Sequence, residues 1–258
     1  MSEELIVVIS GIGRGIGNAL AQSYLFRPNC TVVGSVRNEN APAITALKSA
    51  AANNNSKLLI VKIESASDTD AKDAIERIKA AGIDHINILI ANAGVSPPII
   101  PLETESLSAI ESAFRVNALG PLALYQACHP LLMKSENPKF VAISSAAASI
   151  GAMGSNHAWV APAYCISKSA LNWITVSAHH GNNRLIAVAM NPGPLTDEES
   201  LVDSDMGNKT AREHMGLERA PVTMADCAKK IIKLIDEATR NNTSGKFIHA
   251  IDGTEVQW

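Results

Sequence analysis

The chain has 258 residues, of which 47% are hydrophobic and 18% are charged, and its formal net charge is −3. This balance is typical of a globular protein with a substantial core, and it excludes the basic face that nucleic acids or anionic membranes would need. No apolar run could cross a bilayer, and the acidic start is no signal peptide. The four cysteines lie far apart without a CxxC pair, so we expect a cytoplasmic protein with reduced thiols and no metal site.

The first predicted strand, residues 5–9, is a β-branched run that leads into a glycine-rich turn and then a helix to about residue 26. Glycines allow a tight turn and let the backbone approach a pyrophosphate at the N-terminus of the following helix. Because strand, turn and helix follow one another directly, we predict a dinucleotide-binding loop rather than a turn with packing glycines. The predicted loop is Gly11-Ile12-Gly13-Arg14-Gly15-Ile16-Gly17.

The second predicted strand, residues 30–36, is followed by Arg37. Near this point an acidic residue would bind the ribose 2′-hydroxyl of NAD, whereas an arginine accommodates the 2′-phosphate of NADP. No acidic residue occurs between Cys30 and Asn38. Because Arg14 could reach the same phosphate, the two arginines together favour NADP(H) over NAD(H).

Strands continue to alternate with helices to the end of the chain. This alternation predicts an α/β fold, a Rossmann-type doubly wound parallel sheet of about seven strands flanked by helices. Further strands are expected at residues 57–63, 86–91, 140–144, 185–190 and 246–250. Helices are expected at about residues 41–52, 67–80, 102–133, from the 146–162 loop to 180, and 224–239.

We find no linker or repeat, so we predict a single domain, 1–258, whose cofactor-binding half is about 1–145. The remainder, 146–258, would hold a catalytic helix, a candidate substrate lid over 195–221 and the last strand. Either Ser67 or Asp68 is the expected N-cap of the third helix. Pro121 should distort the long helix and free backbone carbonyls near Asn117.

Tyr164 and Lys168 are four positions apart, so they share one face of their predicted helix. A tyrosine has a pKa of about 10, which a nearby positive charge can lower by roughly 1–3 units, and Tyr164 is therefore a candidate acid–base group. Ser145 follows a predicted strand at the ligand edge of the sheet. Ser144 is the alternative at this place, but side chains alternate along a strand, so only one of the two can face the site.

Taken together, these motifs resemble the short-chain dehydrogenase/reductase family over nearly the whole chain. The C-terminal stretch that ends at Trp258 is similar to fungal polyketide ketoreductases of the norsolorinic acid reductase type and to C-factor-like carbonyl reductases. The family motifs occur in family order: Ser10-Gly11-(x)3-Gly15-Ile16-Gly17, Asn92-Ala93-Gly94, Asn117, Ser145, Tyr164-(x)3-Lys168 and Pro192-Gly193.

The resemblance implies an NADPH-dependent oxidoreductase that reduces a ketone or aldehyde, with an aromatic polyketide as one candidate substrate. It implies that Tyr164 donates a proton to the substrate carbonyl oxygen while Ser145 steadies the developing charge. Lys168 would bind the nicotinamide ribose and lower the Tyr164 pKa, and Asn117 would hold a water that links Lys168 to solvent. The cofactor would also be lined by Asn92, Gly94, Pro192 and Gly193.

Some positions depart from the family pattern. Glu64 stands where an Asp commonly contacts adenine, and either Thr196 or Ser204 could reach the nicotinamide. The longer loop before Tyr164 carries His157 and Trp159, which either line a pocket for a flat aromatic substrate or belong to a surface loop.

Two other functions stay open, a redox-neutral pathway enzyme such as a cyclase or dehydratase, and a non-catalytic NADPH-binding protein. Members of the family often pair through the helices around Asn117 and Tyr164, so the resemblance makes a homodimer or a homotetramer a candidate assembly and leaves a monomer open. We expect no nucleic-acid or membrane partner.

Overall fold

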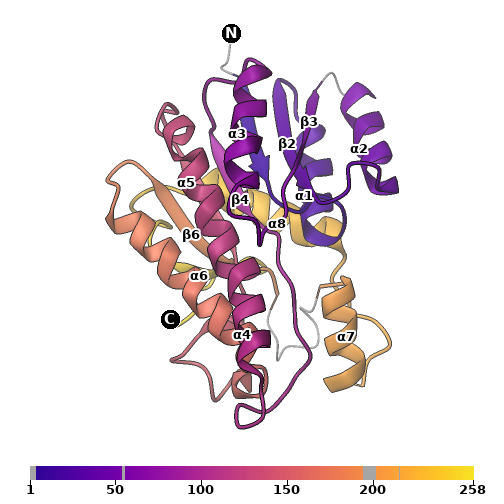
Figure 1. Ribbon diagram of the computed structural model, residues 1–258, viewed down its shortest axis with the longest axis vertical. Helices are drawn as coiled ribbons and strands as arrows, with labels where there is room; N and C mark the ends of the chain where they lie inside the picture. The colour runs from indigo at the N-terminus through magenta and orange to yellow at the C-terminus, as the bar shows by residue number, and fades with distance from the viewer. Residues whose placement is uncertain (1–3, 54–55, 194–201, 215) are drawn as a thin grey trace.

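The computed structural model describes residues 4–53, 56–193, 202–214 and 216–258, in which seven parallel strands form one sheet between two layers of helices (Figure 1). The strand order β3-β2-β1-β4-β5-β6-β7 confirms the predicted doubly wound fold. The strands are β1 (Leu5–Ile9), β2 (Cys30–Val36), β3 (Lys57–Lys62), β4 (Ile88–Ala91), β5 (Lys139–Ile143), β6 (Ile186–Asn191) and β7 (Phe247–His249).

Strand β1 lies at the centre of the sheet, where Val8 is in register with Val33 of β2 and Leu89 of β4. Every residue of β2 and β4 is buried, as expected for strands that are covered on both faces. Alternation along β1 divides the core in two. Val7 packs into the cluster beneath α1, α2 and α8, whereas Val8 packs into the cluster beneath α3, α5 and α6.

The helices lie on both faces of this sheet (Figure 1). No helix in the described ranges combines the length and apolar character needed to cross a bilayer. The α-helices are α1 (Gly15–Leu25), α2 (Pro42–Asn53), α3 (Asp70–Ala80), α4 (Leu107–Phe114), α5 (Gly120–Leu132), α6 (Pro162–His180), α7 (Asp205–His214) and α8 (Met224–Glu237).

Residues 102–133 were expected to form a long helix or a kinked pair, and the structure has two α-helices joined by a distorted turn. Helix α4 is followed by one turn of π-helix, η1 (Arg115–Leu119), and then by α5, which has Pro121 in its first turn. Proline lacks the N–H that an α-helix would supply to the carbonyl of Asn117, four positions earlier. The distortion therefore lies where Pro121 predicts it.

Two local predictions differ from the structure. The stretch expected as an unpatterned lid contains helix α7, although residues 195–201 and 215 lie outside the described part of the chain. The loop after β5 contains two short 3-10 turns, η2 (Ala146–Ala148) and η3 (Ala158–Val160). Both stretches are poor in the apolar periodicity from which helices are predicted.

Candidate active site

Helix α6 carries Tyr164 on its first turn and Lys168 on its second, and both side chains lie at the C-terminal end of β5. The Lys168 Nζ donates a hydrogen bond to the carbonyl oxygen of Ile143 at 2.8 Å and lies 5.9 Å from the centroid of the Tyr164 ring. Ser145, two residues beyond Ile143, forms a side-chain hydrogen bond with Tyr164. The structure thus brings together three of the residues that the sequence singled out.

Burial changes the proton affinity of both ionisable groups. It raises the pKa of Tyr164 to about 12, against the smaller lowering effect of the hydrogen bond with Ser145. It also lowers the pKa of Lys168 to about 8, because the charged ammonium is taken out of water. The expectation that Lys168 lowers the Tyr164 pKa was wrong for this arrangement: burial dominates, and Ser145 rather than Lys168 opposes it.

Ser144 and Ser145 point in different directions. The Ser144 Oγ donates a hydrogen bond to the Oδ1 of Asn172 at 2.6 Å, on the buried side of α6. Ser145 begins the short turn η2, where its Oγ also accepts a hydrogen bond from the backbone N–H of Ala147 at 3.3 Å. Of the two serines, Ser145 is the one beside Tyr164.

Asn117 lies in the π-helical turn and is fully buried. Its Nδ2 donates to the carbonyl of Val95 and to Ser167 Oγ, both at 2.9 Å, while its Oδ1 accepts from the Val95 N–H at 2.8 Å. A Cβ added at Gly94 would lie 3.1 Å from Asn117 Oδ1 and 3.5 Å from Lys168 Nζ. The carboxamide therefore fastens the loop after β4 to α6.

The glycine loop approaches its neighbours closely on its inner side. Gly11 has a φ of +76°, and a Cβ added at Gly17 would lie 2.3 Å from Asn92 Nδ2 and 2.4 Å from the Gly11 carbonyl oxygen. Asn92 was expected to line the adenosine, but its Nδ2 donates to the Ser10 carbonyl at 2.9 Å and to the Gly11 carbonyl at 3.3 Å. The Asn92 side chain therefore holds the start of the glycine loop through these two backbone carbonyls.

On its outer side the loop is open. A Cβ at Gly13 would meet only Val36, at 3.9 Å, and one at Gly15, whose φ is +61°, would meet nothing within 4 Å. The N-cap of α1, Arg14, makes no side-chain capping hydrogen bond, and Ile16 and its neighbours place no acidic residue in the first turn. The N-terminal backbone donors of this helix are thus left for an anion, which is the arrangement a pyrophosphate site requires.

Arg14 and Arg37, which were expected to bind the 2′-phosphate of NADP, differ in their surroundings. Arg14 forms an ion pair with Asp205, the first residue of α7, at 2.9 Å, and both side chains are largely exposed. Arg37 is exposed and makes no ion pair with any residue in the described ranges. Basic side chains therefore stand beyond the ends of β1 and β2, in agreement with the sequence.

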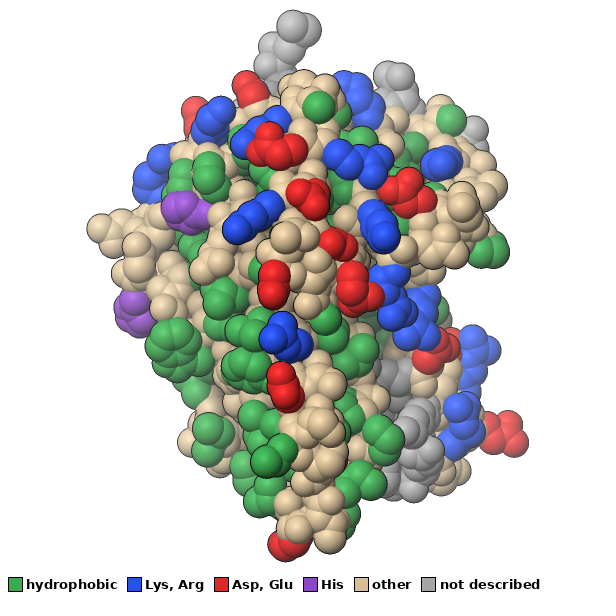
Figure 2. Space-filling model, viewed as in Figure 1, with side chains coloured by type: hydrophobic (Ala, Val, Ile, Leu, Met, Phe, Trp, Pro, Cys, Tyr) green, Lys and Arg blue, Asp and Glu red, His purple; other side chains and the backbone are tan. Residues whose placement is uncertain are grey.

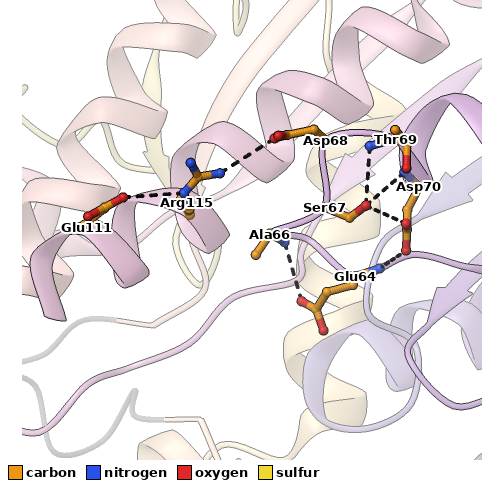
Figure 3. A network of polar contacts seen from close by, with 8 residues as sticks. All are labelled: Glu64, Ala66, Ser67, Asp68, Thr69, Asp70, Glu111 and Arg115. Carbon is orange, nitrogen blue, oxygen red and sulfur yellow. Dashed lines mark hydrogen bonds and ion pairs between the residues drawn. The ribbon is translucent and has the colours of Figure 1, made fainter. Parts of the chain in front are cut away.

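The segment after β3 contains a compact polar network (Figure 3). The Asp70 carboxylate accepts from the backbone N–H of Glu64 at 2.9 Å and from the Ser67 hydroxyl at 2.5 Å. The N-cap of α3 is Thr69, so the prediction of Ser67 or Asp68 was wrong. The Ser67 Oγ nevertheless accepts from the backbone N–H groups of Thr69 at 3.3 Å and Asp70 at 3.2 Å, at the start of this helix. The Glu64 side chain makes only a long hydrogen bond, 3.5 Å from the backbone N–H of Ala66.

The remaining expected residues follow β6. The Pro192 carbonyl accepts a hydrogen bond from Cys227 Sγ at 3.5 Å, and Gly193 is partly buried. Thr196 falls outside the described residues. Ser204 donates from its backbone N–H to the Val202 carbonyl at 2.7 Å and stands just before α7.

His157 and Trp159 lie in the loop before α6, with ring centroids 5.1 Å apart. Ala158, between them, is buried, and its carbonyl accepts a hydrogen bond from Cys165 Sγ at 3.0 Å. Since Cys165 follows Tyr164, the loop is anchored beside the tyrosine. The Trp159 side chain remains 51% exposed at the rim of the site.

Sequence reasoning missed two side chains that contact the candidate site residues. Asn172 bonds to Ser144, and Asp205 pairs with Arg14. The only signal for Asn172 was its position four residues after Lys168, which puts it on the same helical face. Asp205 had no such signal, because 191 positions separate it from Arg14.

A doubly wound sheet with an open glycine loop, and with buried Ser145 and Lys168 beside a partly buried Tyr164 at its carboxyl edge, is typical of nicotinamide-dependent oxidoreductases. The family model described as short chain dehydrogenase matches residues 5–205. The chain belongs to this family of oxidoreductases, as predicted.

Relatives of known name cover the whole chain. It is 43% identical over 260 residues to the short-chain dehydrogenase srdF of Neurospora crassa, with 100% of this chain and 99% of that protein covered. It is 35% identical to the norsolorinic acid ketoreductase of Aspergillus parasiticus, with 99% and 92% covered. The predicted resemblance to fungal reductases of this type is confirmed.

A solved structure has the same fold over its full length. It is the NADPH-bound carbonyl reductase from chicken fatty liver, which is 25% identical, covers 100% of both chains and superposes with a TM-score of 0.82. The parallel sheet and its flanking helices are therefore common to both proteins.

Proposed function

We propose that the protein is an NADPH-dependent reductase that converts a ketone or an aldehyde into an alcohol. The observation that carries this proposal is the placement of Tyr164 between Ser145 and Lys168 at the carboxyl edge of the sheet. The NADPH-bound carbonyl reductase and the norsolorinic acid ketoreductases support it by analogy.

The residues fit a nicotinamide dinucleotide. The uncapped N-terminus of α1 and the open outer side of Gly13 and Gly15 would hold the pyrophosphate. Arg14 and Arg37 are cations at the place where NADP carries a 2′-phosphate. The buried ammonium of Lys168 would bind the nicotinamide ribose.

When bound, the reduced nicotinamide supplies a hydride to the carbonyl carbon. Tyr164 gives its phenolic proton to the carbonyl oxygen, so that hydride and proton together make the alcohol. With a pKa of about 12, this phenol is protonated at neutral pH and so has a proton to donate. The Ser145 hydroxyl donates a hydrogen bond to the same oxygen and stabilises the charge that develops there.

After the transfer Tyr164 must regain its proton. Lys168 has a pKa of about 8, so it releases and takes up a proton near neutral pH. A water at Asn117 would connect it to solvent.

The substrate that we propose is an aromatic polyketide ketone. His157 and Trp159 present exposed rings on the loop that is anchored to Cys165, the residue after Tyr164, and flat aromatic substrates stack on such rings. The fungal relatives named as norsolorinic acid ketoreductases support this choice.

We propose, in addition, that the protein forms a homodimer through α6 and the start of α5. Trp173 and Ile166 on α6 are 72% and 42% exposed, and Leu119 before α5 is 39% exposed. Hydrophobic side chains gather over this part of the surface (Figure 2). Exposed apolar surface of this kind commonly marks a protein interface.

The test of the reaction is the decay of nicotinamide absorbance with NADPH and, separately, NADH, against small ketones, aldehydes and acylated anthraquinones. We expect the wild type to oxidise NADPH with at least one class, and Tyr164→Phe to lose about 10²- to 10⁴-fold in kcat while NADPH still binds. Full activity of Tyr164→Phe would refute the proposal. Product formed without net NADPH consumption would favour the redox-neutral alternative instead, and binding without any turnover would favour the non-catalytic one.

A further inference from the structure

The last residues of β5 and the start of the loop that follows are fastened to one face of α6 by three successive contacts. Ile143 accepts from Lys168, Ser144 donates to Asn172, and Ser145 bonds to Tyr164. The partners on α6 are spaced by four residues, so they lie along one side of the helix. The middle contact joins two residues to which the proposed reaction assigns no role.

The Ser144–Asn172 contact is short and lies inside the protein. Its length is 2.6 Å, and both residues are 3% exposed. Ser144 is also held through its backbone N–H, which donates to the Met190 carbonyl at 2.7 Å. Ser144 is thereby fixed on both its main chain and its side chain.

Asn172 has an unusual balance of hydrogen bonds. Its Oδ1 accepts from Ser144, whereas its Nδ2 is one of two buried polar side-chain atoms that lack a hydrogen-bond partner in the described part of the chain. Leaving a buried donor unpaired costs stability, and an apolar residue at this helical position would avoid that cost. Among the described residues, the hydrogen-bond partner of the Asn172 side chain is Ser144.

We propose that Asn172 is a positioning residue that holds Ser144 inward and thereby aims Ser145 at Tyr164. Ser144 and Ser145 are joined by one peptide bond, so a Ser144 that is held on its main chain and its side chain restricts the backbone from which the Ser145 side chain projects. Ser145 itself has little else to hold it, because its other side-chain contact is the 3.3 Å hydrogen bond from Ala147 within η2. Without Asn172, the Ser145 side chain would populate several orientations instead of one.

For turnover this inference rests on the proposed reductase function, but the contact can be tested without turnover. The chain has three tyrosines, Tyr24, Tyr125 and Tyr164, so a protein labelled with ¹³C at the tyrosine Cζ gives a simple spectrum. Tyr164→Phe assigns the Tyr164 signal. The position of a Cζ signal depends on the hydrogen bonds of the phenol, so it reports the contact with Ser145 directly.

The spectra to compare are those of the wild type, Ser144→Ala, Asn172→Ala and the double variant. We expect the Tyr164 signal to move in both single variants and to move no further in the double variant, because each change breaks the same contact. The signals of Tyr24 and Tyr125 should stay in place. An unmoved Tyr164 signal in both single variants, or a double variant whose displacement equals the sum of the two, would overturn the proposal.

A matched control is Thr175→Val on the same helix. The Thr175 hydroxyl is equally buried, but it donates to the Leu171 carbonyl within α6 at 2.8 Å and does not touch β5. This variant should leave the Tyr164 signal unmoved. Should Asn172→Ala fail to fold, Ser144→Ala removes only one hydroxyl and decides the question by itself.

Steady-state kinetics with an acylated anthraquinone and NADPH add the consequence for turnover. We expect Asn172→Ala to lower kcat about tenfold and to leave both KM values within twofold, because the residue touches neither reactant. A merely structural role would lower the active fraction and leave the kcat of the folded fraction unchanged, contrary to the proposal. If the wild type itself does not turn over, the reductase function fails, while the Cζ spectra still decide the role of Asn172.

Discussion

The loop after β1 depends on glycines, which have no side chain, whereas the segment after β5 depends on buried polar side chains. Gly17 leaves no room for a Cβ beside Asn92, while Ser145 and Lys168 contribute hydrogen bonds to the Tyr164 region. The two regions face one another across the carboxyl edge of the same sheet. We therefore expect added atoms to destabilise the glycine region and removed atoms to impair the polar region. Substitutions of each kind test this difference.

The largest effect is expected from Ser145→Ala, which removes one atom from the polar region. Losing a hydrogen-bond donor to a developing negative charge costs roughly 10²- to 10³-fold in kcat. Stability should hardly change, and NADPH affinity should stay within twofold. Stopped-flow and steady-state absorbance at the nicotinamide band measure the rate, and a kcat within threefold of the wild type would contradict this role.

Gly17→Ala adds one atom to the glycine region. The new Cβ would lie 2.3 Å from Asn92 Nδ2, so we expect a loss of about 3 kcal/mol in the free energy of unfolding, together with weaker NADPH binding. Gly15→Ala is the matched control, since a Cβ there meets nothing and only the positive φ costs about 1 kcal/mol. Urea unfolding measures both variants, and equal losses would remove the steric argument.

Lys168→Met tests the cost of burying charge in the polar region. The pKa of Lys168 is lowered to about 8 in the folded chain, so the unfolded chain binds more protons between pH 8 and about 10.5. The stability of the wild type should therefore rise with pH across this window, while below pH 8 the buried charge exerts its full penalty. We expect Lys168→Met to be about 2 kcal/mol more stable than the wild type at pH 7, and the gap to close by pH 10.

This stability gain should come with lost activity, because Lys168 is a proposed cofactor ligand and proton source. Urea unfolding at pH 7 and pH 9.5 without added nucleotide measures the gap. A gap that does not change with pH would show that packing rather than charge is responsible.

The smallest effect is expected from Asp205→Asn, which breaks the ion pair to Arg14 on the outer side of the glycine region. Exposed pairs are weak, so NADPH affinity should rise only about two- to fivefold, since Arg14 is released for the 2′-phosphate. NADH affinity should not change, and the gain should shrink in 1 M salt. Fluorescence titration with both nucleotides measures it, and an equal gain for NADH would point to another cause.

Much of the fold could be predicted because the parallel strands are buried runs, and the catalytic helix because Tyr164 and Lys168 share one face. Helix α7 could not be predicted, since its residues are predominantly polar. The sign of the Tyr164 pKa change also escaped prediction. The four-residue spacing shows that Lys168 lies near Tyr164. It does not show how far burial raises the pKa of the phenol, or that the Lys168 ammonium donates its hydrogen bond to the Ile143 carbonyl.

In the candidate site, too, some features could be predicted from the sequence and others could not. Alternation along the strand predicted that Ser144 and Ser145 diverge, because that follows from local geometry. The partner of Ser144, the pairing of Arg14 with Asp205 and the use of Asn92 beneath the glycine loop depend on how distant segments meet. Contacts of that kind follow from the assembled sheet rather than from any local pattern.

The central place of β1 has a consequence for how the protein is made. Its second neighbour, β4, begins at Ile88, about 80 residues after β1 ends, which corresponds to roughly 4 to 16 s of synthesis on the ribosome. During that interval one edge of β1 has no strand to pair with, and its run of Ile and Val is open to other nascent chains. Slow translation between β1 and β4 should therefore favour aggregation, and chaperones that bind nascent chains should have their greatest effect on this part of the protein.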